Sequence, residues 1–286
     1  MKEGLKNTLR AVGIYHPLQS AYRRLLNKLE IRSNRIHYAK YRGSGFTCNF
    51  CGARYSVFKP ELPLNAIAPA INNNHVIAGY GENVFCPDCL SKNRERLVLA
   101  VIKDTIDFAG KSILHFSPEE NIYRFLAKYS KVTTVDISPG FYRSVDRSVK
   151  YGDATSLEFS SAAFDLVIAN HILEHIPDDR KAISEMFRVL KPGGVAILQV
   201  PFSVTIPSTL EQPDINDGAL QERLYGQKDH VRIYAFDDFV SRVLGSGFRS
   251  GILSPAQLEK YAQFAIQKGE YFMMFHKPGQ DFVKNT

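Results

Sequence analysis

The strongest constraint on the fold is a run between residues 164 and 198 in which two apolar segments flank an amphipathic one. Residues 164–169 form an apolar strand of the kind expected when helices cover both faces of a sheet. Residues 179–190 follow with helical spacing of apolar positions. The segment 191–194, Lys-Pro-Gly-Gly, then ends that helix and starts another buried strand. This order predicts a βαβ unit with parallel strands.

The same alternation of strands and helices extends on both sides of this run. Further strands are expected at residues 112–116, 132–136, 194–200, 248–253 and 271–275, and further helices at 120–129 and 236–245. Strands that alternate with helices of this length are typical of a parallel α/β sheet. The sequence therefore predicts a doubly wound, Rossmann-like domain over residues 99–286.

The central run also resembles a known family. The stretch Phe164-Asp-Leu-Val-Ile-Ala-Asn-His-Ile-Leu-Glu-His-Ile-Pro-Asp-Asp179 and the following stretch 186–198 resemble class I S-adenosylmethionine-dependent methyltransferases. The type 11 methyltransferase domains are the most similar branch, and the resemblance covers about residues 111–275. It implies a mostly parallel seven-stranded sheet whose last strand is antiparallel, and methyl transfer from S-adenosylmethionine.

The resemblance assigns cofactor contacts by position. Asp136 ends an apolar strand and matches the family's ribose-binding acid. Asp153, within Gly152-Asp-Ala154, stands where the family places an acid that binds the adenine amino group. The full set implied is His115, Phe116, Ser117, Pro118, Glu119, Asp136, Ile137, Asp153, Ala154, Asn170 and His171. Either aspartate, taken alone, could equally be a turn or cap residue.

The first cofactor loop departs from the family pattern. Residues 112–122 contain no glycine, although glycines usually let the backbone approach the cofactor there. His115 takes the position of the usual acid, and Ser117 stands where a glycine is common. A bacterial subgroup with a His-Phe-Ala/Ser-Pro-Glu loop, often preceded by paired cysteines, is similar. By that resemblance Glu119 binds the amino group of the methionine moiety.

Methyl transfer mainly requires alignment of the reacting atoms and exclusion of water. A hydroxyl acceptor also needs a general base, for which His171 and His230 are the candidates. Each of these histidines could instead be a hydrogen-bonded structural residue. Residues 207–228 form an unusually long connection, which we interpret as a substrate cap or lid. The alternative is a surface loop without a function.

The cysteines form a second constellation. Cys48, Cys51, Cys86 and Cys89 make two CxxC pairs separated by 34 residues, and they are the only cysteines in the chain. Two such turns can direct four thiolates at one tetrahedral, structural zinc. The separation is longer than in common zinc ribbons, so an inserted loop is expected. We therefore expect a zinc-ribbon-like module at 46–98. Two unrelated pairs of thiols are the alternative.

Residues 1–45 form a basic arm. They hold ten basic and two acidic side chains, +8, which leaves −1 for the rest of a chain of net charge +7. After Pro17, apolar residues recur at helical spacing. Such a helix can pack on its own protein, which we expect here, or lie on an anionic membrane or along phosphates. Neither a secretory signal nor a membrane-spanning run is present, so a cytoplasmic protein is expected.

Three functions are compatible with these features. The first is an enzyme that methylates a small molecule or a glycan, at oxygen. The second is an RNA methyltransferase whose zinc module and basic arm hold the nucleic acid. The third is a non-catalytic, zinc-stabilised interaction module on a methyltransferase fold.

Overall fold

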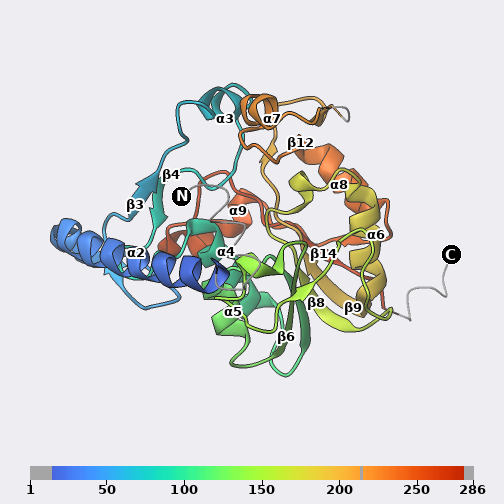
Figure 1. Cartoon of the computed structure of the whole chain (residues 1–286), viewed down its shortest axis with the longest axis horizontal. Helices are drawn as coiled ribbons and strands as arrows, with labels where there is room; N and C mark the ends of the chain where they lie inside the picture. The colour runs from blue at the N-terminus through green and yellow to red at the C-terminus, as the bar shows by residue number, and fades with distance from the viewer. Residues whose placement is uncertain (1–14, 213–214, 280–286) are drawn as a thin grey trace.

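The computed structural model describes residues 15–212 and 215–279, and its centre is a seven-stranded sheet (Figure 1). The strand order is β13-β14-β9-β8-β5-β6-β7. Their bounds are β5 (Ser112–Phe116), β6 (Lys131–Asp136), β7 (Lys150–Tyr151), β8 (Phe164–Ile168), β9 (Leu190–Ile197), β13 (Arg249–Ser250) and β14 (Met274–His276). Neighbours from β7 to β9 are parallel, whereas β14 is antiparallel to β9. The predicted sheet is thus confirmed.

Several strand bounds differ from the expectation: β9 spans residues 190–197 and not 194–200, β13 spans 249–250 and not 248–253, and β14 spans 274–276 and not 271–275. β9 begins at Leu190, four residues early, because the backbone N–H of Gly193 donates to the carbonyl of Lys277 and that of Lys277 donates to Gly194. These bonds continue the sheet through the Lys-Pro-Gly-Gly segment. β7 was not located from the sequence, since its two residues are exposed and carry no apolar pattern.

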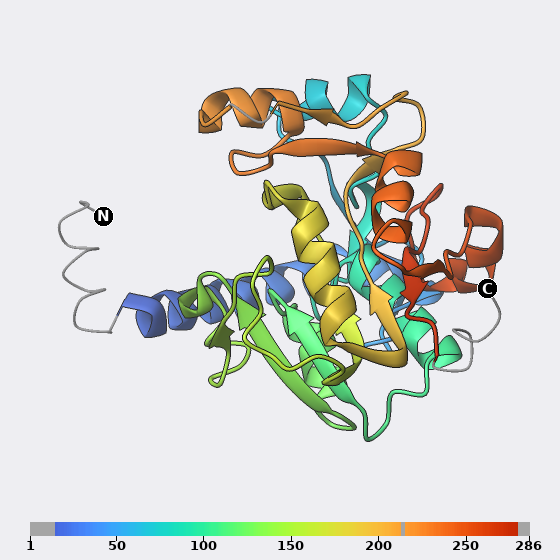
Figure 2. The same ribbon diagram turned by 90° about the vertical axis from the view of Figure 1, so that its right-hand side faces the viewer.

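Helices cover both faces of the sheet (Figure 2). α6 (Asp179–Val189) and α8 (Phe236–Leu244) pack on one face, and α4 (Asn93–Thr105) and α5 (Glu120–Leu126) pack on the other. Successive side chains of β8 point to opposite faces of the sheet. Val167 packs in the hydrophobic cluster on the α6 side, and Leu166 and Ile168 pack in the cluster on the α4 side. This burial of apolar side chains is the main stabilising contribution to the domain.

The cysteine-containing segment folds against the same sheet. It contains η1 (Ala39–Tyr41), β1 (Arg42–Thr47), β2 (Arg54–Tyr55), β3 (Lys59–Glu61), α3 (Ala68–Asn73) and β4 (Gly81–Phe85). β1 pairs with β2, and β3 pairs with β4. The expected boundary between residues 98 and 99 falls inside α4, and that between 45 and 46 falls inside β1. The segment therefore continues into the sheet domain without a linker.

One buried arginine connects the cysteine-containing segment to the sheet domain. Arg96 of α4 is fully buried, and its guanidinium lies 4.7 Å from the centre of the Phe58 ring. Its Nε donates to Phe264 O at 2.7 Å. The other four N–H groups donate to the carbonyl oxygens of Asn83, Val84, Ser91 and Ala265, at 2.6–3.0 Å. All five donors are thus satisfied, three by the cysteine segment and two by η4 (Glu259–Phe264) and its cap.

A second layer of structure lies over the edge of the sheet. Residues 207–228, the predicted cap, contain β11 (Leu210–Glu211) and α7 (Gly218–Tyr225). β11 forms a small sheet with β10 (Phe202–Ser203) and β12 (Arg232–Ala235). α7 lies beside α3 in both views, so the insertion between the two CxxC pairs packs on the cap (Figures 1 and 2).

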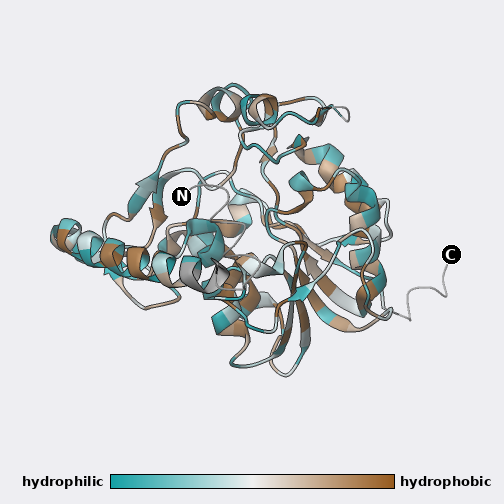
Figure 3. Cartoon of the chain, viewed as in Figure 1, coloured by the Kyte–Doolittle hydropathy of each residue, from teal (hydrophilic) through white to brown (hydrophobic). Residues whose placement is uncertain are grey.

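The basic arm forms α2 (Tyr15–His37), which contacts the cysteine segment through Glu30 and Arg35, but its apolar stripe does not pack on the protein as expected. The apolar residues Tyr22, Leu25, Leu26 and Leu29 are 44–63% exposed. At 100° per residue they share one stripe, while the partly or fully covered Ile31 and Asn34 lie on the opposite side of the helix. Figure 3 shows hydrophobic bands along α2 at the edge of the molecule. Residues 1–14 of the arm lie outside the described part of the chain.

Within the described ranges, no helix is both long enough and apolar enough to cross a bilayer.

Arg96 supports a first prediction. An Arg96→Met variant removes all five guanidinium donors from carbonyl groups in a mostly buried setting, so we expect the free energy of unfolding to fall by at least about 3 kcal/mol. Arg54→Met, an exposed substitution in the same segment, is the matched control and should change it by less than about 0.5 kcal/mol. Urea denaturation measures both. Equal stability of the two variants would contradict the joining role of Arg96.

Candidate active site

A cavity of about 650 Å³ lies at the carboxyl ends of β5, β6 and β8. This edge is where ligands bind in open α/β sheets. Seven of the predicted cofactor residues line it: Phe116, Ser117, Asp136, Ile137, Asp153, Ala154 and His171. His115, Pro118, Glu119 and Asn170 are not on its wall. The volume is in the range of ordinary small-molecule sites.

Asp136 is held in place at the end of β6. Its Oδ2 accepts a hydrogen bond of 2.6 Å from Ser117 Oγ, and its Oδ1 accepts one of 2.6 Å from the backbone of Ser138. Ser117 has a φ of 43°, a left-handed conformation that glycine adopts most easily. The loop therefore takes the glycine-like conformation without a glycine, and the serine hydroxyl orients the acid. A carboxylate has further lone pairs for two ribose hydroxyls.

Asp153 forms a local turn beside the cavity. Its Oδ1 accepts hydrogen bonds of 2.8 Å from both the backbone N–H and the hydroxyl of Thr155. Oδ2 is left to accept from a ligand. Ile137 and Tyr142 line the same cavity, and Tyr142 was not foreseen from the sequence. An aromatic ring, an aliphatic side chain and a carboxylate make a suitable environment for a purine.

Glu119 lies behind the cavity at the start of α5. Its carboxylate accepts hydrogen bonds from His115 Nε2 at 2.7 Å and from Asn170 Nδ2 at 3.1 Å. Burial raises the pKa of this carboxyl, but the hydrogen bond and charge of His115 together with Arg94 hold the pKa below its usual range. Burial and the charge of Glu119 raise the pKa of neighbouring Glu95 to about 7. Glu119 therefore keeps a negative charge that suits an ammonium group.

A second cavity, about 170 Å³, adjoins the first and shares His171 and His175 with it. Three separate parts of the chain line it. The cysteine segment and the start of α4 supply Tyr80 and Arg94, the turn after β8 supplies Glu174, and the cap and the residues after it supply Tyr225 and His230. The predicted cap residues therefore do reach a cavity beside the cofactor site.

His171 stands between the two cavities. It follows β8, adopts a φ of 52°, and donates its backbone N–H to Gln199 O at 2.7 Å. Burial first, and then the charge of Arg94, lower the pKa of its imidazole, while Glu174 opposes that shift. A neutral imidazole is available to accept a proton. The sequence-based candidate base thus lies at the junction of the two cavities.

His230, the other candidate base, faces only the second cavity. Its Nδ1 lies 3.2 Å from Tyr225 O and its Nε2 lies 4.0 Å from Glu174. Burial lowers the pKa of His230, opposed mainly by the charge of Glu174. His175 differs, because its contact with Asp229 raises its pKa despite burial.

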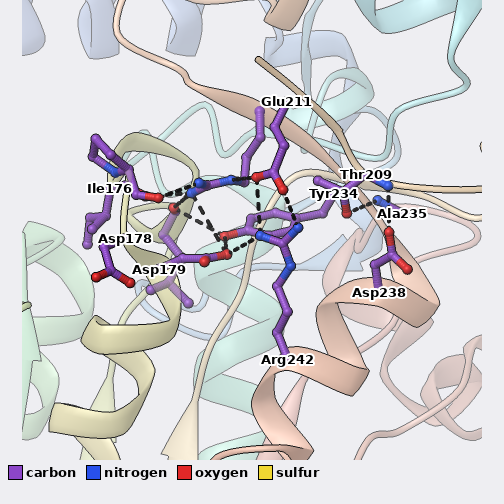
Figure 4. Close-up of polar contacts among 12 residues, drawn as sticks. Ile176, Asp178, Asp179, Thr209, Glu211, Tyr234, Ala235, Asp238 and Arg242 are labelled. Carbon is purple, nitrogen blue, oxygen red and sulfur yellow. Dashed lines mark hydrogen bonds and ion pairs between the residues drawn. The ribbon is translucent and has the colours of Figure 1, made fainter. Parts of the chain in front are cut away.

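A buried ion cluster fixes the turn that carries Glu174 and His175 (Figure 4). This turn is η3 (Leu173–His175). Arg232 of β12 donates to the carbonyl oxygens of Leu173, Ile176 and Pro177 at 2.5–3.0 Å. It also pairs with Glu211 of the cap at 2.8 Å. The same cluster therefore holds both the turn and the cap.

Arg242 of α8 completes the cluster. It contacts Glu211 Oε1 at 2.6 Å and Asp179 Oδ2 at 2.7 Å, and the Tyr234 hydroxyl donates to the same Asp179 oxygen at 2.7 Å. In Figure 4, Glu211 and Asp179 converge on this arginine from the cap and from α6. The start of the cap is thus anchored through charged hydrogen bonds.

The four cysteines of the segment 46–98 form one cluster. All their sulfurs lie within 4.8 Å of one another, with Cys48 3.5 Å from Cys89 and Cys51 3.7 Å from Cys86. Four thiolates at 2.3 Å from a tetrahedral zinc are separated by about 3.8 Å. The donor set and spacing therefore fit a zinc ion.

Comparison with known proteins agrees with this geometry. Residues 119–198 match the family described as a methyltransferase domain. A protein named a probable S-adenosylmethionine-dependent methyltransferase from Mycolicibacterium smegmatis is 31% identical over 85 residues, 30% of this chain and 32% of that protein. The ubiquinone/menaquinone biosynthesis C-methyltransferase UbiE of Pasteurella multocida is 32% identical over 139 residues, 45% of this chain and 48% of that protein.

The chain thus spans between about a third and a half of the length of these two relatives. Among solved structures, an S-adenosylmethionine dependent methyltransferase from Mesorhizobium loti superposes with a TM-score of 0.45 and 15% identity, covering 62% of this chain and 96% of that one. The matched segment contains Glu119, Asp136, Asp153 and His171. Residues 119–198 of this chain are therefore similar to a methyltransferase domain.

The ion cluster supports a second prediction. An Arg242→Met variant removes a partner from two carboxylates in a mostly buried cluster, so we expect the free energy of unfolding to fall by about 3 kcal/mol. Lys260→Met, which breaks the exposed ion pair with Asp104, is the matched control and should cost less than about 1 kcal/mol. Urea denaturation compares the two. An equal effect of both substitutions would show that the cap is not anchored by this cluster.

Proposed function

We propose that the protein is an S-adenosylmethionine-dependent methyltransferase that acts on a small acceptor, a small molecule or a sugar unit, at oxygen. The observation that carries the proposal is the pair of joined cavities. The larger presents Asp136 and Asp153 at the carboxyl edge of the sheet, and the smaller is polar, capped and only about 170 Å³. A small polar acceptor fits the second cavity, with His171 between the two.

Each residue of the site has a separate role in this proposal. Asp136 would accept both ribose hydroxyl hydrogens, Asp153 the adenine amino hydrogens, and Glu119 would hold the ammonium group. The bound cofactor supplies an activated methyl group on a sulfonium. His171 would accept the proton of the acceptor hydroxyl at its imidazole nitrogen. α3 and α7 exclude water from the acceptor side.

The cofactor site gives the third prediction. Asp136→Ala removes the acceptor of two ribose hydrogen bonds, each about 1.5–3 kcal/mol when one partner is charged. The affinity for S-adenosylhomocysteine should therefore fall by at least about 100-fold, measured by titration calorimetry. Asp107→Ala, an exposed substitution outside the cavity, should leave the affinity unchanged. Unchanged affinity in Asp136→Ala would place the cofactor elsewhere.

We further propose that the four cysteines hold a structural zinc. Both CxxC turns are closed by backbone bonds, from Gly52 N to Cys48 O at 2.8 Å and from Leu90 N to Cys86 O at 2.9 Å. Four protein ligands leave no open coordination position, so the ion would support folding and not chemistry. Its support would extend to Tyr80 and Arg94 in the acceptor cavity, because the same segment supplies them.

Zinc removal is the fourth prediction. Cys86→Ser should reduce bound zinc by one atom per chain and lower the melting temperature by at least about 5 °C, since metal binding contributes to folding. Metal analysis and calorimetry measure the two effects. Ser56→Ala, an exposed change in the same segment, should alter neither. A zinc content equal to that of the unaltered protein would overturn the assignment.

For α2 we propose contact with an anionic membrane surface. The exposed stripe of Tyr22, Leu25, Leu26 and Leu29 is flanked by exposed Arg23 on one side and by exposed Lys28 and Arg32 on the other. A helix with one apolar face and basic flanks suits the boundary between acyl chains and anionic headgroups. RNA would use the basic side chains but would leave the apolar stripe exposed.

The fifth prediction concerns the binding of α2 to lipid vesicles. Binding to vesicles that contain phosphatidylserine, measured by sedimentation, should be at least about tenfold weaker for the double variant Leu25→Glu and Leu29→Glu. The reason is that both apolar insertion and charge attraction are lost. The pair Leu62→Glu and Leu64→Glu, two leucines that are also exposed but lie outside α2, is the control. Tight binding to single-stranded RNA with none to vesicles would contradict the proposal.

A further inference from the structure

Glu174 carries a buried carboxylate that the rest of the described chain does not satisfy. Its side chain is 1% exposed, and neither oxygen accepts a hydrogen bond from a described residue. The nearest charged or polar side chains are His171 Nδ1 at 3.6 Å and His230 Nε2 at 4.0 Å. A buried carboxylate without donors costs several kcal/mol, and such groups commonly mark the place of a missing ligand.

Two imidazoles near this carboxylate, those of His175 and His230, each contact a hydrogen-bond acceptor through Nδ1. His175 Nδ1 lies 3.2 Å from Asp229 Oδ2, and His230 Nδ1 lies 3.2 Å from Tyr225 O. A carboxylate and a carbonyl oxygen can only accept, so each Nδ1 carries the proton in the neutral ring. Each Nε2 then presents a lone pair. A carboxylate or carbonyl behind the imidazole is the usual support of a metal-binding histidine.

The three side chains also converge. One ligand atom from each of Glu174, His175 and His230 lies within 4.8 Å of the others, and the two rings meet edge to face with centroids 4.6 Å apart. Ligand atoms at about 2.1 Å from a shared metal are separated by about 3.0–3.4 Å. An approach of about 1–2 Å, which the attraction of a cation favours, would complete the site.

We propose that Glu174, His175 and His230 bind a first-row divalent metal ion at the wall of the acceptor cavity. Two imidazoles and one carboxylate suit zinc, iron, cobalt or manganese better than magnesium. Three protein ligands leave open positions, and all three residues line the 170 Å³ cavity. The ion would differ from the one proposed for the cysteines, where four thiolates leave no opening.

This inference rests on the proposed methyl transfer and narrows its acceptor. A metal ion at this wall would bind an acceptor oxygen directly and lower the pKa of its hydroxyl. His171, which lines both cavities, lies beside the bound oxygen. The acceptor class is therefore a small molecule with a hydroxyl that can ligate a metal, most favourably one with a second oxygen on the adjacent carbon.

Cobalt(II) is the probe for the test. The full-length protein, with zinc retained at the cysteines, is titrated with Co²⁺ by calorimetry and by visible absorption. Thiolate-bound cobalt absorbs intensely in the near ultraviolet, so exchange at the cysteines is detected separately. We expect one Co²⁺ per chain without thiolate bands. Glu174→Gln and His230→Gln should each weaken its binding by at least about 100-fold, more than the loss of an outer hydrogen-bond partner.

Two further variants distinguish an indirect effect on Co²⁺ binding from no effect. Asp229→Asn should weaken Co²⁺ binding by about tenfold, because Asp229 orients His175 without touching the ion. Glu259→Gln, an exposed substitution, should leave it unchanged. Circular dichroism checks that each variant is folded. Absence of Co²⁺ binding by the unaltered protein, or equal binding by Glu174→Gln and His230→Gln, would overturn the proposed metal site.

Binding of S-adenosylhomocysteine separates this inference from the proposed function. Glu174→Gln should bind S-adenosylhomocysteine like the unaltered protein, because Glu174 lines only the acceptor cavity. If S-adenosylhomocysteine binds and Co²⁺ does not, the metal site is wrong and the cofactor assignment stands. If Co²⁺ binds with the expected losses and S-adenosylhomocysteine does not, the metal site stands and the proposed methyl transfer is wrong.

Discussion

The fully buried guanidinium of Arg96 is the interaction on which the arrangement of this chain depends. A cation taken out of water is costly unless every donor finds a partner. Here five carbonyl oxygens and the face of Phe58 surround it. Three of those oxygens belong to the cysteine segment and two to the end of η4 and its cap, so neither part can shift without leaving the charge uncompensated. A zinc with four thiolates, net charge −2, would further stabilise this cation.

Because Arg96 fixes the cysteine segment against the sheet domain, it also explains how the cavity of about 170 Å³ is formed. The cysteine segment places α3 against α7 and brings Tyr80 and Arg94 to the cavity wall. From the other side, Arg232 and Arg242 hold the cap and the turn with Glu174 and His175. The larger cavity is lined by the loops that follow the strand ends, by the turn around His175 and by Asp229. The smaller cavity is lined by all three parts, so the cysteine segment contributes directly to its wall.

The sequence predicts what local chemistry determines and misses what distant packing determines. β5 was placed at its observed limits, and Asp136 and Asp153 at the cavity, because strand patterns and strand-end acids are local signals. Arg94 and Tyr80 had no such signal, since their place depends on the packing of the insertion on the cap. The exposure of the apolar stripe on α2 was also missed, because helical spacing defines a face without showing what covers it.

A crystal structure with S-adenosylhomocysteine tests the central claim most directly, because it shows both the presence and the direction of the ligand. The account predicts adenine beside Ile137 and Asp153, the ribose hydroxyls on Asp136, the amino group at Glu119, and the sulfur directed toward His171 and the smaller cavity. S-adenosylhomocysteine bound outside the 650 Å³ cavity, or reversed so that adenine lies against His171 and His175, would contradict it.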